Sequence, residues 1–431
     1  MPVRLDRSSA DFAKAFADFL GAKREVSADI EAATRAIVDD VAARGDAALI
    51  EATRKFDRLG LDAGGLRITS AEIEAALRAC DTATLDALKF ARDRIEVFHQ
   101  RQLPKDERFT DALGVELGWR WSAIDAVGLY VPGGTAAYPS SVLMNAVPAR
   151  VAGVARVVMV VPSPDGKLNP LVLAAASLGG VSEIYRVGGA QAVAALAYGT
   201  ATIAPVAKIV GPGNAYVAAA KRQVFGKVGI DMIAGPSEVL VIADSTGNAG
   251  WIAADLLAQA EHDVNAQSIL ITDSQTLADD VERAVQAQLS TLPRADIARA
   301  SWNDFGAIIV VKQLDQAIEL ANAIAAEHLE IMTADPEMIA AKIRNAGAIF
   351  LGAHTPEAIG DYVGGSNHVL PTARSARFSS GLGVLDFMKR TSILKCGPDQ
   401  LRALGPAAMT LGKAEGLDAH ARSVGLRLNL S

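Results

Sequence analysis

The stretch Val127-Gly128-Leu129-Tyr130-Val131-Pro132-Gly133-Gly134 marks the point where the chain begins to follow an α/β pattern. It is a short apolar run that ends in a Pro-Gly-Gly turn, as expected for a buried strand followed by a tight connection. Downstream of this turn, short β-branched segments alternate with Ala-rich helical segments. That alternation is typical of parallel sheets with crossover helices.

Two sets of strands are predicted around and after this turn, which indicates two α/β sheet domains. Residues 1 to about 110 read as helices, 114–124 alternates like a strand, and the tail after about residue 380 reads as Gly-broken helical pieces. The first set comprises 154–161, 183–187, 208–210 and 238–243; the second comprises 268–272, 307–311, 329–332 and 348–351, with helices near 278–289, 314–327 and 336–345.

The composition is that of an acidic globular protein. The chain has 431 residues, half of them hydrophobic, and a formal net charge of −7, which argues against a nucleic-acid partner and favours small molecules. Cys80 and Cys396 provide no disulfide framework, and Cys396 lacks an identifiable partner that would make it a nucleophile. The N-terminus has no leader-like pattern and no apolar run is long enough for a membrane span, so we expect a cytoplasmic protein without a membrane partner.

Glycine-rich turns follow several strands of the first set. Ligands of α/β sheets bind at the carboxyl ends of parallel strands, where glycine lets the backbone approach a phosphate. No Gly-x-Gly-x-x-Gly fingerprint is present and any single turn needs glycine for steric reasons alone, but the four together favour a nucleotide. The turns are 130–134, 187–191, 211–214 and 235–237.

Gln259 and His262 are candidate metal ligands. They are three residues apart near the end of a predicted helix, so they share a face and can converge on one cation. Asp361 and His420 could complete a nitrogen- and oxygen-rich zinc site with room for substrate. His368 also has polar neighbours, whereas His99 and His354 are predicted to face solvent.

Glu327-His328 is the best candidate for a general acid–base pair. We place it at a helix end, from which both side chains can reach a cleft, and histidine transfers protons efficiently near neutral pH. The alternative is a solvated helix terminus with a histidine at the negative end of the helix dipole.

Seven ordered motifs closely resemble the histidinol dehydrogenase family, and the resemblance runs from about residue 30 to 425. Val264 departs from the family pattern, which has proline there, but no chemical side chain is lost. The motifs are 130–141 (Tyr-Val-Pro-Gly-Gly through Tyr-Pro-Ser-Ser), 211–214 (Gly-Pro-Gly-Asn), 234–238 (Ala-Gly-Pro-Ser-Glu), 259–263 (Gln-Ala-Glu-His-Asp), 327–330 (Glu-His-Leu-Glu), 367–372 (Asn-His-Val-Leu-Pro-Thr) and 378–382 (Phe-Ser-Ser-Gly-Leu).

The resemblance implies an NAD- and zinc-dependent homodimer that oxidises L-histidinol through L-histidinal to L-histidine, in histidine biosynthesis, with one zinc per subunit. It implies the catalytic pair Glu327 and His328. By residue, it implies zinc ligands Gln259, His262, Asp361 and His420, the last from the partner subunit; substrate contacts from Ser237, His328, His368, Glu415 and the four zinc ligands; and NAD contacts from Tyr130, Gln191 and Asn214.

The resemblance also implies two incomplete Rossmann-like domains, one inserted into the other. The expected parts are an N-terminal helical segment (1–22), a discontinuous Rossmann-like domain that carries the metal helix (23–129 and 237–382), a Rossmann-like NAD-binding domain (130–236) and a C-terminal tail that contributes to the partner subunit's site (383–431).

Two alternative functions stay open at this point. A zinc-dependent dehydrogenase for another small alcohol, such as sulfopropanediol, is disfavoured because 367–372 keeps the histidinol pattern and His368, Glu415 and His420 are all present. A non-catalytic nucleotide- or metal-binding protein is disfavoured because it would not need both Glu327 and His328. Fold alone cannot decide among these functions.

Overall fold

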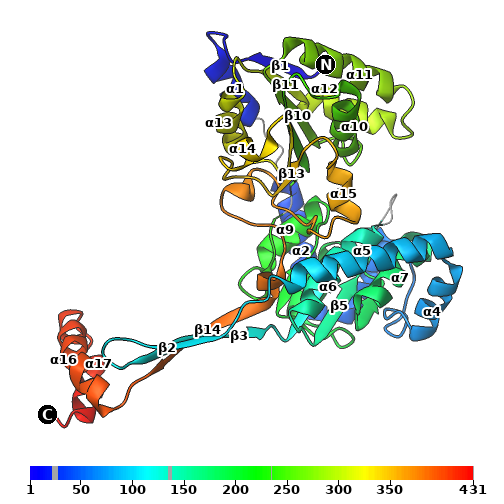
Figure 1. Cartoon of the computed structure of the whole chain (residues 1–431). Helices are drawn as coiled ribbons and strands as arrows, with labels where there is room; N and C mark the ends of the chain where they lie inside the picture. The colour runs from blue at the N-terminus through cyan, green and yellow to red at the C-terminus, as the bar shows by residue number, and fades with distance from the viewer. Residues whose placement is uncertain (22–27, 134–137, 234, 431) are drawn as a thin grey trace.

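The computed structural model describes residues 1–21, 28–133, 138–233 and 235–430 and consists of two α/β lobes and an extended arm (Figure 1). The N-terminus lies on the upper lobe of Figure 1 and the C-terminus at the tip of the arm. Each lobe is built on a parallel sheet, which confirms the predicted fold class. Among the described residues, no helix combines the length and apolarity needed to cross a membrane.

The sheet of the upper lobe has the strand order β1-β11-β10-β9-β12-β13. β9 and β10 are buried along their whole length because helices cover both faces of the sheet. Its strands are β1 (Val3–Asp6), β9 (Glu238–Ala243), β10 (Gln267–Thr272), β11 (Ala307–Val310), β12 (His328–Met332) and β13 (Ala348–Leu351), and its helices are α1 (Phe12–Gly21), α10 (Ala249–Ala260), α11 (Gln275–Leu289), α12 (Ala295–Phe305), α13 (Asp315–Ile324), α14 (Pro336–Ala340) and α15 (Glu357–Tyr362).

The sheet of the lower lobe has the strand order β6-β5-β4-β7-β8. Its strands are β4 (Ala126–Tyr130), β5 (Arg156–Val160), β6 (Glu183–Tyr185), β7 (Lys208–Val210) and β8 (Gly229–Ile230). The helices around it are α2 (Ala28–Arg44), α3 (Asp46–Phe56), α4 (Ser70–Ala79), α5 (Thr82–Gln100), α6 (Pro139–Val151), α7 (Pro170–Gly179), α8 (Gly189–Tyr198) and α9 (Ala215–Val224); short 3-10 turns occur at Pro164–Gly166, Ser375–Arg377 and Val384–Phe387. All eight predicted segments form strands, but 238–243 (β9), predicted with the first set, belongs to the sheet of the upper lobe, where it pairs with β10 and β12.

The N-terminal part of the chain differs from the predicted domain plan. β1 is a strand and not part of a helical segment, because it pairs in parallel with β11, with Val3 opposite Ala307. Helices α2 to α5 pack on the lower lobe: Val38 and Leu49 share a core with the β4 and β5 strands, and Ile95 lies in the core on the other side of this sheet. An amphipathic stripe shows that a helix covers a sheet but not which sheet. The predicted boundary at 22/23 lies outside the described residues.

The arm is an antiparallel ribbon that ends in two helices (Figure 1). Its strands are β2 (Glu107–Thr110), β3 (Glu116–Ala123) and β14 (Met388–Lys395), and its helices are α16 (Pro398–Ala414) and α17 (Asp418–Arg427). β14 was not predicted, because Met-Lys-Arg-Thr-Ser-Ile-Leu-Lys shows little alternation. Leu394, Leu411 and Leu426 are each more than 60% exposed, so the arm of one chain leaves apolar surface uncovered.

The carboxyl edge of the lower sheet is joined to the amino edge of the upper sheet. In the lower sheet the strand order reverses between β4 and β7, so the carboxyl ends of these strands form a switch point of the kind that binds ligands. Ser141, in the first turn of the helix after β4, lies 3.2 Å from His368 through its Oγ and the ring Nε2. Asn367 Nδ2 donates to Met144 O at 2.7 Å. These contacts join the carboxyl edge of the lower sheet to the segment beside the amino ends of β9 and β12.

Candidate active site

Glu327 and His328 lie at the amino end of β12 and not at a helix terminus. α13 ends at Ile324, and Ala325, with a left-handed φ of 50°, turns the chain out of the helix. Both side chains are buried, with residue exposures of 5% for Glu327 and 4% for His328. The interpretation as a solvated helix terminus is therefore wrong. A turn at Ala325 separates the end of α13 from Glu327 and His328, and both side chains are buried at the amino edge of the sheet.

The ring of His328 is held in one orientation. Its Nδ1 lies 3.2 Å from the carbonyl oxygen of Glu238, to which it donates in the tautomer that satisfies this contact. Its Nε2 lies 3.7 Å from Asp361 Oδ1 and has no hydrogen-bond partner within the described ranges. A histidine held through Nδ1–H presents its second nitrogen as a proton acceptor.

Carboxylates surround this ring. Glu327 Oε2 accepts from the Glu238 amide at 3.0 Å, and Glu357 Oε1 lies 3.8 Å from His328 Nδ1. His328, Glu357 and Asp361 each offer a ligand atom, and these atoms all lie within 4.8 Å of one another. One cation could be held among them.

Burial and mutual interactions shift the pKa values of the groups in this cluster. Burial raises the pKa of Glu327 to about 7 and that of Glu357 to about 8. Burial by itself lowers the pKa of His328, but Glu357, Glu327 and Asp361 together raise it well above its ordinary value. Burial acts to raise the pKa of Asp361, but its interactions with His328 outweigh burial and lower it. A bound divalent cation would balance these carboxylates, so the cluster fits a metal centre.

Gln259 and His262 approach the same cluster from α10. Gln259, in the last turn, is 1% exposed, and its carboxamide satisfies both neighbours when its nitrogen faces Glu357 Oε1 at 2.5 Å and its oxygen faces the Glu238 amide at 3.1 Å. His262 lies just beyond the helix, is exposed, and contributes to the lowered pKa of Asp361. An amide, an imidazole and a carboxylate form a donor set that suits zinc.

His368 and Ser237, both expected to contact substrate, lie in this site, together with Ser141 and Glu357, which were not among the expected site residues. The His368 ring bridges the lobes, with Nδ1 2.9 Å from Asp361 O and Nε2 beside Ser141 Oγ. Glu357 lies one turn before Asp361 on α15, and this i,i+4 spacing is the signal that could have identified it. Ser237, immediately before β9, is half-buried at the same amino edge.

A second layer of carboxyl groups supports Glu357. The Glu357 amide donates to Glu330 Oε1 at 2.7 Å, and the carboxyl group of Glu330 interacts with that of Asp255. Burial, followed by the charge of Asp255, raises the pKa of Glu330 to about 9, and burial raises that of Asp255 to about 6. This pair holds the start of α15 and therefore the helix that carries Asp361.

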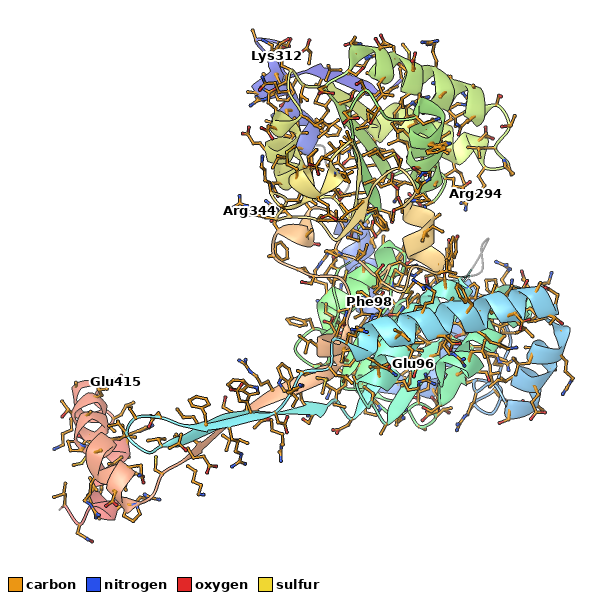
Figure 2. The ribbon with its side chains drawn as sticks, viewed as in Figure 1. Glu96, Phe98, Arg294, Lys312, Arg344 and Glu415 are labelled. Carbon is orange, nitrogen blue, oxygen red and sulfur yellow. The ribbon has the colours of Figure 1, made fainter. Side chains whose placement is uncertain are left out.

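His420 and Glu415 lie elsewhere in the same chain. Both are exposed and lie in the arm, His420 on α17 and Glu415 at the end of α16. Figure 2 shows Glu415 at the tip of the arm, remote from both lobes. One chain therefore does not bring these two residues to the buried cluster.

The residues predicted to face NAD gather at the carboxyl edge of the lower sheet. Tyr130, at the end of β4, is 3% exposed, its hydroxyl accepts from the Gly189 amide at 3.0 Å, and burial raises its pKa to about 12. Gln191, on α8, is 2% exposed, so it and Tyr130 lie beneath the turns. Asn214 is exposed and caps α9 by accepting from the Tyr216 amide at 3.1 Å. Gly134 of the predicted turn 130–134 and Ala234 of the 234–238 motif lie outside the described residues.

His99 does not face solvent as predicted, whereas His354 does. The His99 ring is fully buried, its Nδ1 lies 2.7 Å from Ile95 O, and burial lowers its pKa. The charged residues around it in the sequence lie on the opposite face of α5. His99 therefore belongs to the core of the lower lobe and not to a site.

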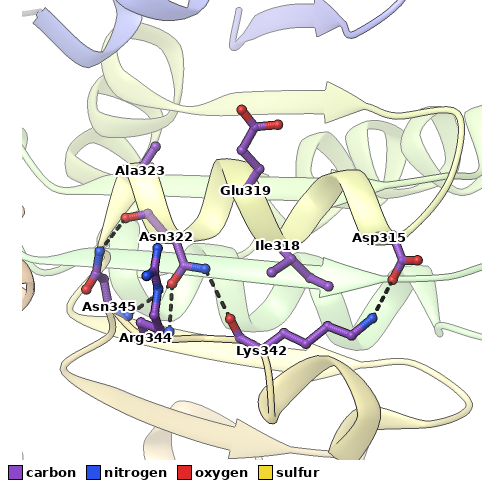
Figure 3. A pocket seen from close by; sticks show the side chains of 8 residues that line it. All are labelled: Asp315, Ile318, Glu319, Asn322, Ala323, Lys342, Arg344 and Asn345. Atoms are coloured by element: carbon purple, nitrogen blue, oxygen red, sulfur yellow. Dashed lines mark hydrogen bonds and ion pairs between the residues drawn. The ribbon is translucent and has the colours of Figure 1, made fainter.

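A surface hollow beside α13 offers no comparable chemistry (Figure 3). Several of the polar groups that line it are bonded to one another. Asn322 Oδ1 accepts from the amides of Arg344 and Asn345 at 2.7 and 3.1 Å, and Lys342 Nζ donates to Asp315 at 3.1 Å. These bonds fix the connection that follows α14, so we assign the hollow a structural role.

Comparisons with known proteins agree with this geometry. The family model described as histidinol dehydrogenase matches residues 21–428. A histidinol dehydrogenase of Bradyrhizobium diazoefficiens is 85% identical and one of Brucella abortus is 69% identical, each over the whole of both chains. The crystal structure of histidinol dehydrogenase from Elizabethkingia anophelis is 35% identical, covers 99% of this chain and 98% of its own, and has a TM-score of 0.94.

These relatives extend over both lobes and the arm, and they share the order of elements that builds the buried cluster. The chain therefore belongs to the histidinol dehydrogenase family, the oxidoreductases of histidine biosynthesis that act on histidinol.

Proposed function

We propose that the protein oxidises L-histidinol to L-histidinal and then to L-histidine, with reduction of two NAD and with one zinc per subunit. The observation that carries this proposal is the His328 ring, which is held through Nδ1 by the Glu238 carbonyl and lies beside Glu327 and the metal-like donors. A base, a second titratable group and a cation site together are what a two-step oxidation of an alcohol requires.

Gln259, His262 and Asp361 would hold the zinc together with His420 of the partner subunit. Bound zinc would chiefly orient the substrate through its imidazole and amino nitrogens. Ser237, His368 and Glu415 of the partner subunit would complete the substrate pocket. Since these donors include no thiolate, the site suits zinc with open positions for substrate.

His328 acts first, as the base that takes the alcohol proton at Nε2 while hydride leaves the substrate carbon. Glu357 and Asp361 raise the pKa of this ring here, and neutralisation of their charge by a cation frees the ring to accept a proton. The Glu238 carbonyl keeps Nδ1 protonated, so that the tautomer stays correct.

Glu327 acts in the second oxidation. Its burial, which raises its pKa to about 7, places its titration where a carboxylate can still accept a proton from water at neutral pH. The water attacks the bound aldehyde, and the hydrate then loses the second hydride. The water supplies the second oxygen of the histidine carboxylate.

NAD would bind over the switch point of the lower sheet and accept each hydride. Tyr130, Gln191 and Asn214 support this placement, since they lie at the carboxyl ends of β4, β6 and β7. The Ser141–His368 contact adds to the argument, because it brings this edge within reach of the buried cluster.

The arm would cross to a second copy of the chain, so that each site is completed by its partner. Its exposed leucines and the distance of Glu415 from the lobes support this proposal. Coexpression of Glu327→Gln and His420→Asn chains tests it, since each variant alone is expected to be inactive while a mixed dimer has one intact site. Recovery of about a quarter of the normal activity is expected from random pairing; no recovery would mean that the site is not shared.

The yield of NADH per molecule of L-histidinol tests the whole proposal. Zinc-loaded enzyme with limiting substrate should give two NADH, and EDTA-treated enzyme very little. One NADH would remove Glu327 from its proposed role. None, with activity on another small alcohol, would place the protein in a different branch of the family.

A further inference from the structure

A buried ion pair lies directly behind the Gly211–Asn214 turn. Lys221 Nζ and Asp231 Oδ1 are in contact, and their side chains are only 2% and 1% exposed. Lys221 is on α9, two turns into the helix that follows the Gly211–Asn214 turn, and Asp231 follows β8. The proposed chemistry assigns no role to this pair.

Both charges are bonded to Gly211. Lys221 Nζ donates to Gly211 O at 3.0 Å, and Asp231 Oδ2 accepts from Gly211 N at 2.8 Å. These two groups belong to the successive peptide units on either side of the Gly211 α-carbon, so holding both fixes φ and ψ of this residue. The φ of Gly211 is +107°, a conformation that side chains rarely allow.

The backbone of β4 approaches Gly211 closely, so that this position has no room for a side chain. A β-carbon on Gly211 would lie 2.2 Å from the carbonyl oxygen of Tyr130, and Pro212 restricts the next residue. The direction in which the chain leaves β7, and so the position of Asn214 at the start of α9, is set by the ion pair and by the backbone of β4.

Stability alone does not explain this pair. Desolvation of two charges offsets most of their attraction, and an apolar pair of similar volume often serves a core equally well. What an apolar pair cannot do is bind one residue through both its N–H and its C=O. The charges therefore point to a requirement for a fixed backbone at this turn.

We propose that Lys221 and Asp231 are positioning residues for NAD, because they fix the turn that presents Asn214 to the cofactor. This inference rests on the proposed function, which places NAD at the switch point. Asp231→Asn should raise the KM and the dissociation constant for NAD about tenfold, the equivalent of one hydrogen bond. The KM for histidinol and the zinc content should stay at the wild-type values.

Glu183→Gln is the matched control. Glu183 pairs with Arg156 in the same lobe, through Oε1 to Nε at 2.7 Å, but it lies at the amino end of β6, away from the turn. The substitution changes an acid to an amide in both variants, so a general loss of stability would affect both. Only Asp231→Asn is expected to weaken NAD binding, as measured by calorimetry on the zinc-loaded enzyme.

The double variant Lys221→Met with Asp231→Asn covers the case in which the single variant does not fold, since it leaves no unpaired buried charge. It is expected to fold and to weaken NAD binding as well. Wild-type affinity for NAD in either folded variant, or an equal loss for Glu183→Gln, would overturn the inference. A wild-type enzyme that reduces no NAD with histidinol would instead overturn the proposed function.

Discussion

If the proposed function holds, Glu327→Gln should separate the two oxidation steps. The glutamine oxygen can still accept from the Glu238 amide, a contact of 3.0 Å in the wild type, so the local backbone keeps its bond. The substitution also removes a buried acid whose pKa of about 7 reflects the cost of its burial, so we expect the stability to change by no more than about 1 kcal/mol. Loss of a general base should slow the aldehyde oxidation about 10²–10⁴-fold, or about 3–5 kcal/mol in the barrier.

The assay compares two substrates in the same zinc-loaded preparation. NADH formation from L-histidinal should fall by the full factor, while the first turnover of L-histidinol, followed in a stopped-flow instrument, should fall much less. His328→Asn serves as the control, because it should slow the first step as well. Histidinal oxidation at the wild-type rate in Glu327→Gln would refute the assignment of the water-activating base.

Three further predictions follow from the same geometry. Gln259→Ala should lose zinc while its thermal midpoint stays near that of the metal-free wild type, since the hydrophobic core does not depend on this side chain. A zinc assay combined with thermal denaturation checks this, and an unfolded variant would count against it. Glu330→Gln should flatten the pH dependence of the stability of the metal-free protein in urea. Burial raises the pKa of Glu330 in the folded state to about 9, so its contribution to stability is present at low pH and is lost as the pH rises from the unfolded pKa towards that value. An unchanged slope would contradict the raised pKa. Gly211→Ala should lower the free energy of unfolding by about 2–4 kcal/mol, because its β-carbon would lie 2.2 Å from Tyr130 O. Gly226→Ala, also at positive φ but with no neighbour within 4 Å, should lower it by about 1 kcal/mol. Equal urea midpoints for the two variants would show that backbone strain alone, and not the contact with Tyr130, sets the loss of stability.

Most strands of the two sheets were predictable, and the clearest cases, β9 and β10, are buried on both faces. A buried parallel strand must be a short, nearly continuous apolar run, and β9 and β10 meet that requirement independently of their neighbours. β1 and β14 were not predictable, since they are partly exposed and contain polar residues that a strand tolerates only when a partner fixes its register.

The candidate residues were predictable where local spacing carries the chemistry. Gln259 and His262 share a helix face, and Glu327 and His328 are adjacent, so their combination is visible in the chain. Their environment was not visible: the contacts that surround Glu327 and His328 and shift their pKa values come from Glu238 at the start of β9 and from Glu357 and Asp361 on α15.

The sequence by itself determined the class of fold, the family and the candidates for the reactive side chains, because periodicity and motif spacing are properties of neighbouring residues. Only the tertiary structure decided that helices α2 to α5 cover the lower sheet, that Ser141 and Glu357 join the site, and that His420 stays on an arm away from it. The physical reason is that packing between distant segments depends on shape and on the burial of complementary surfaces, which no local pattern records.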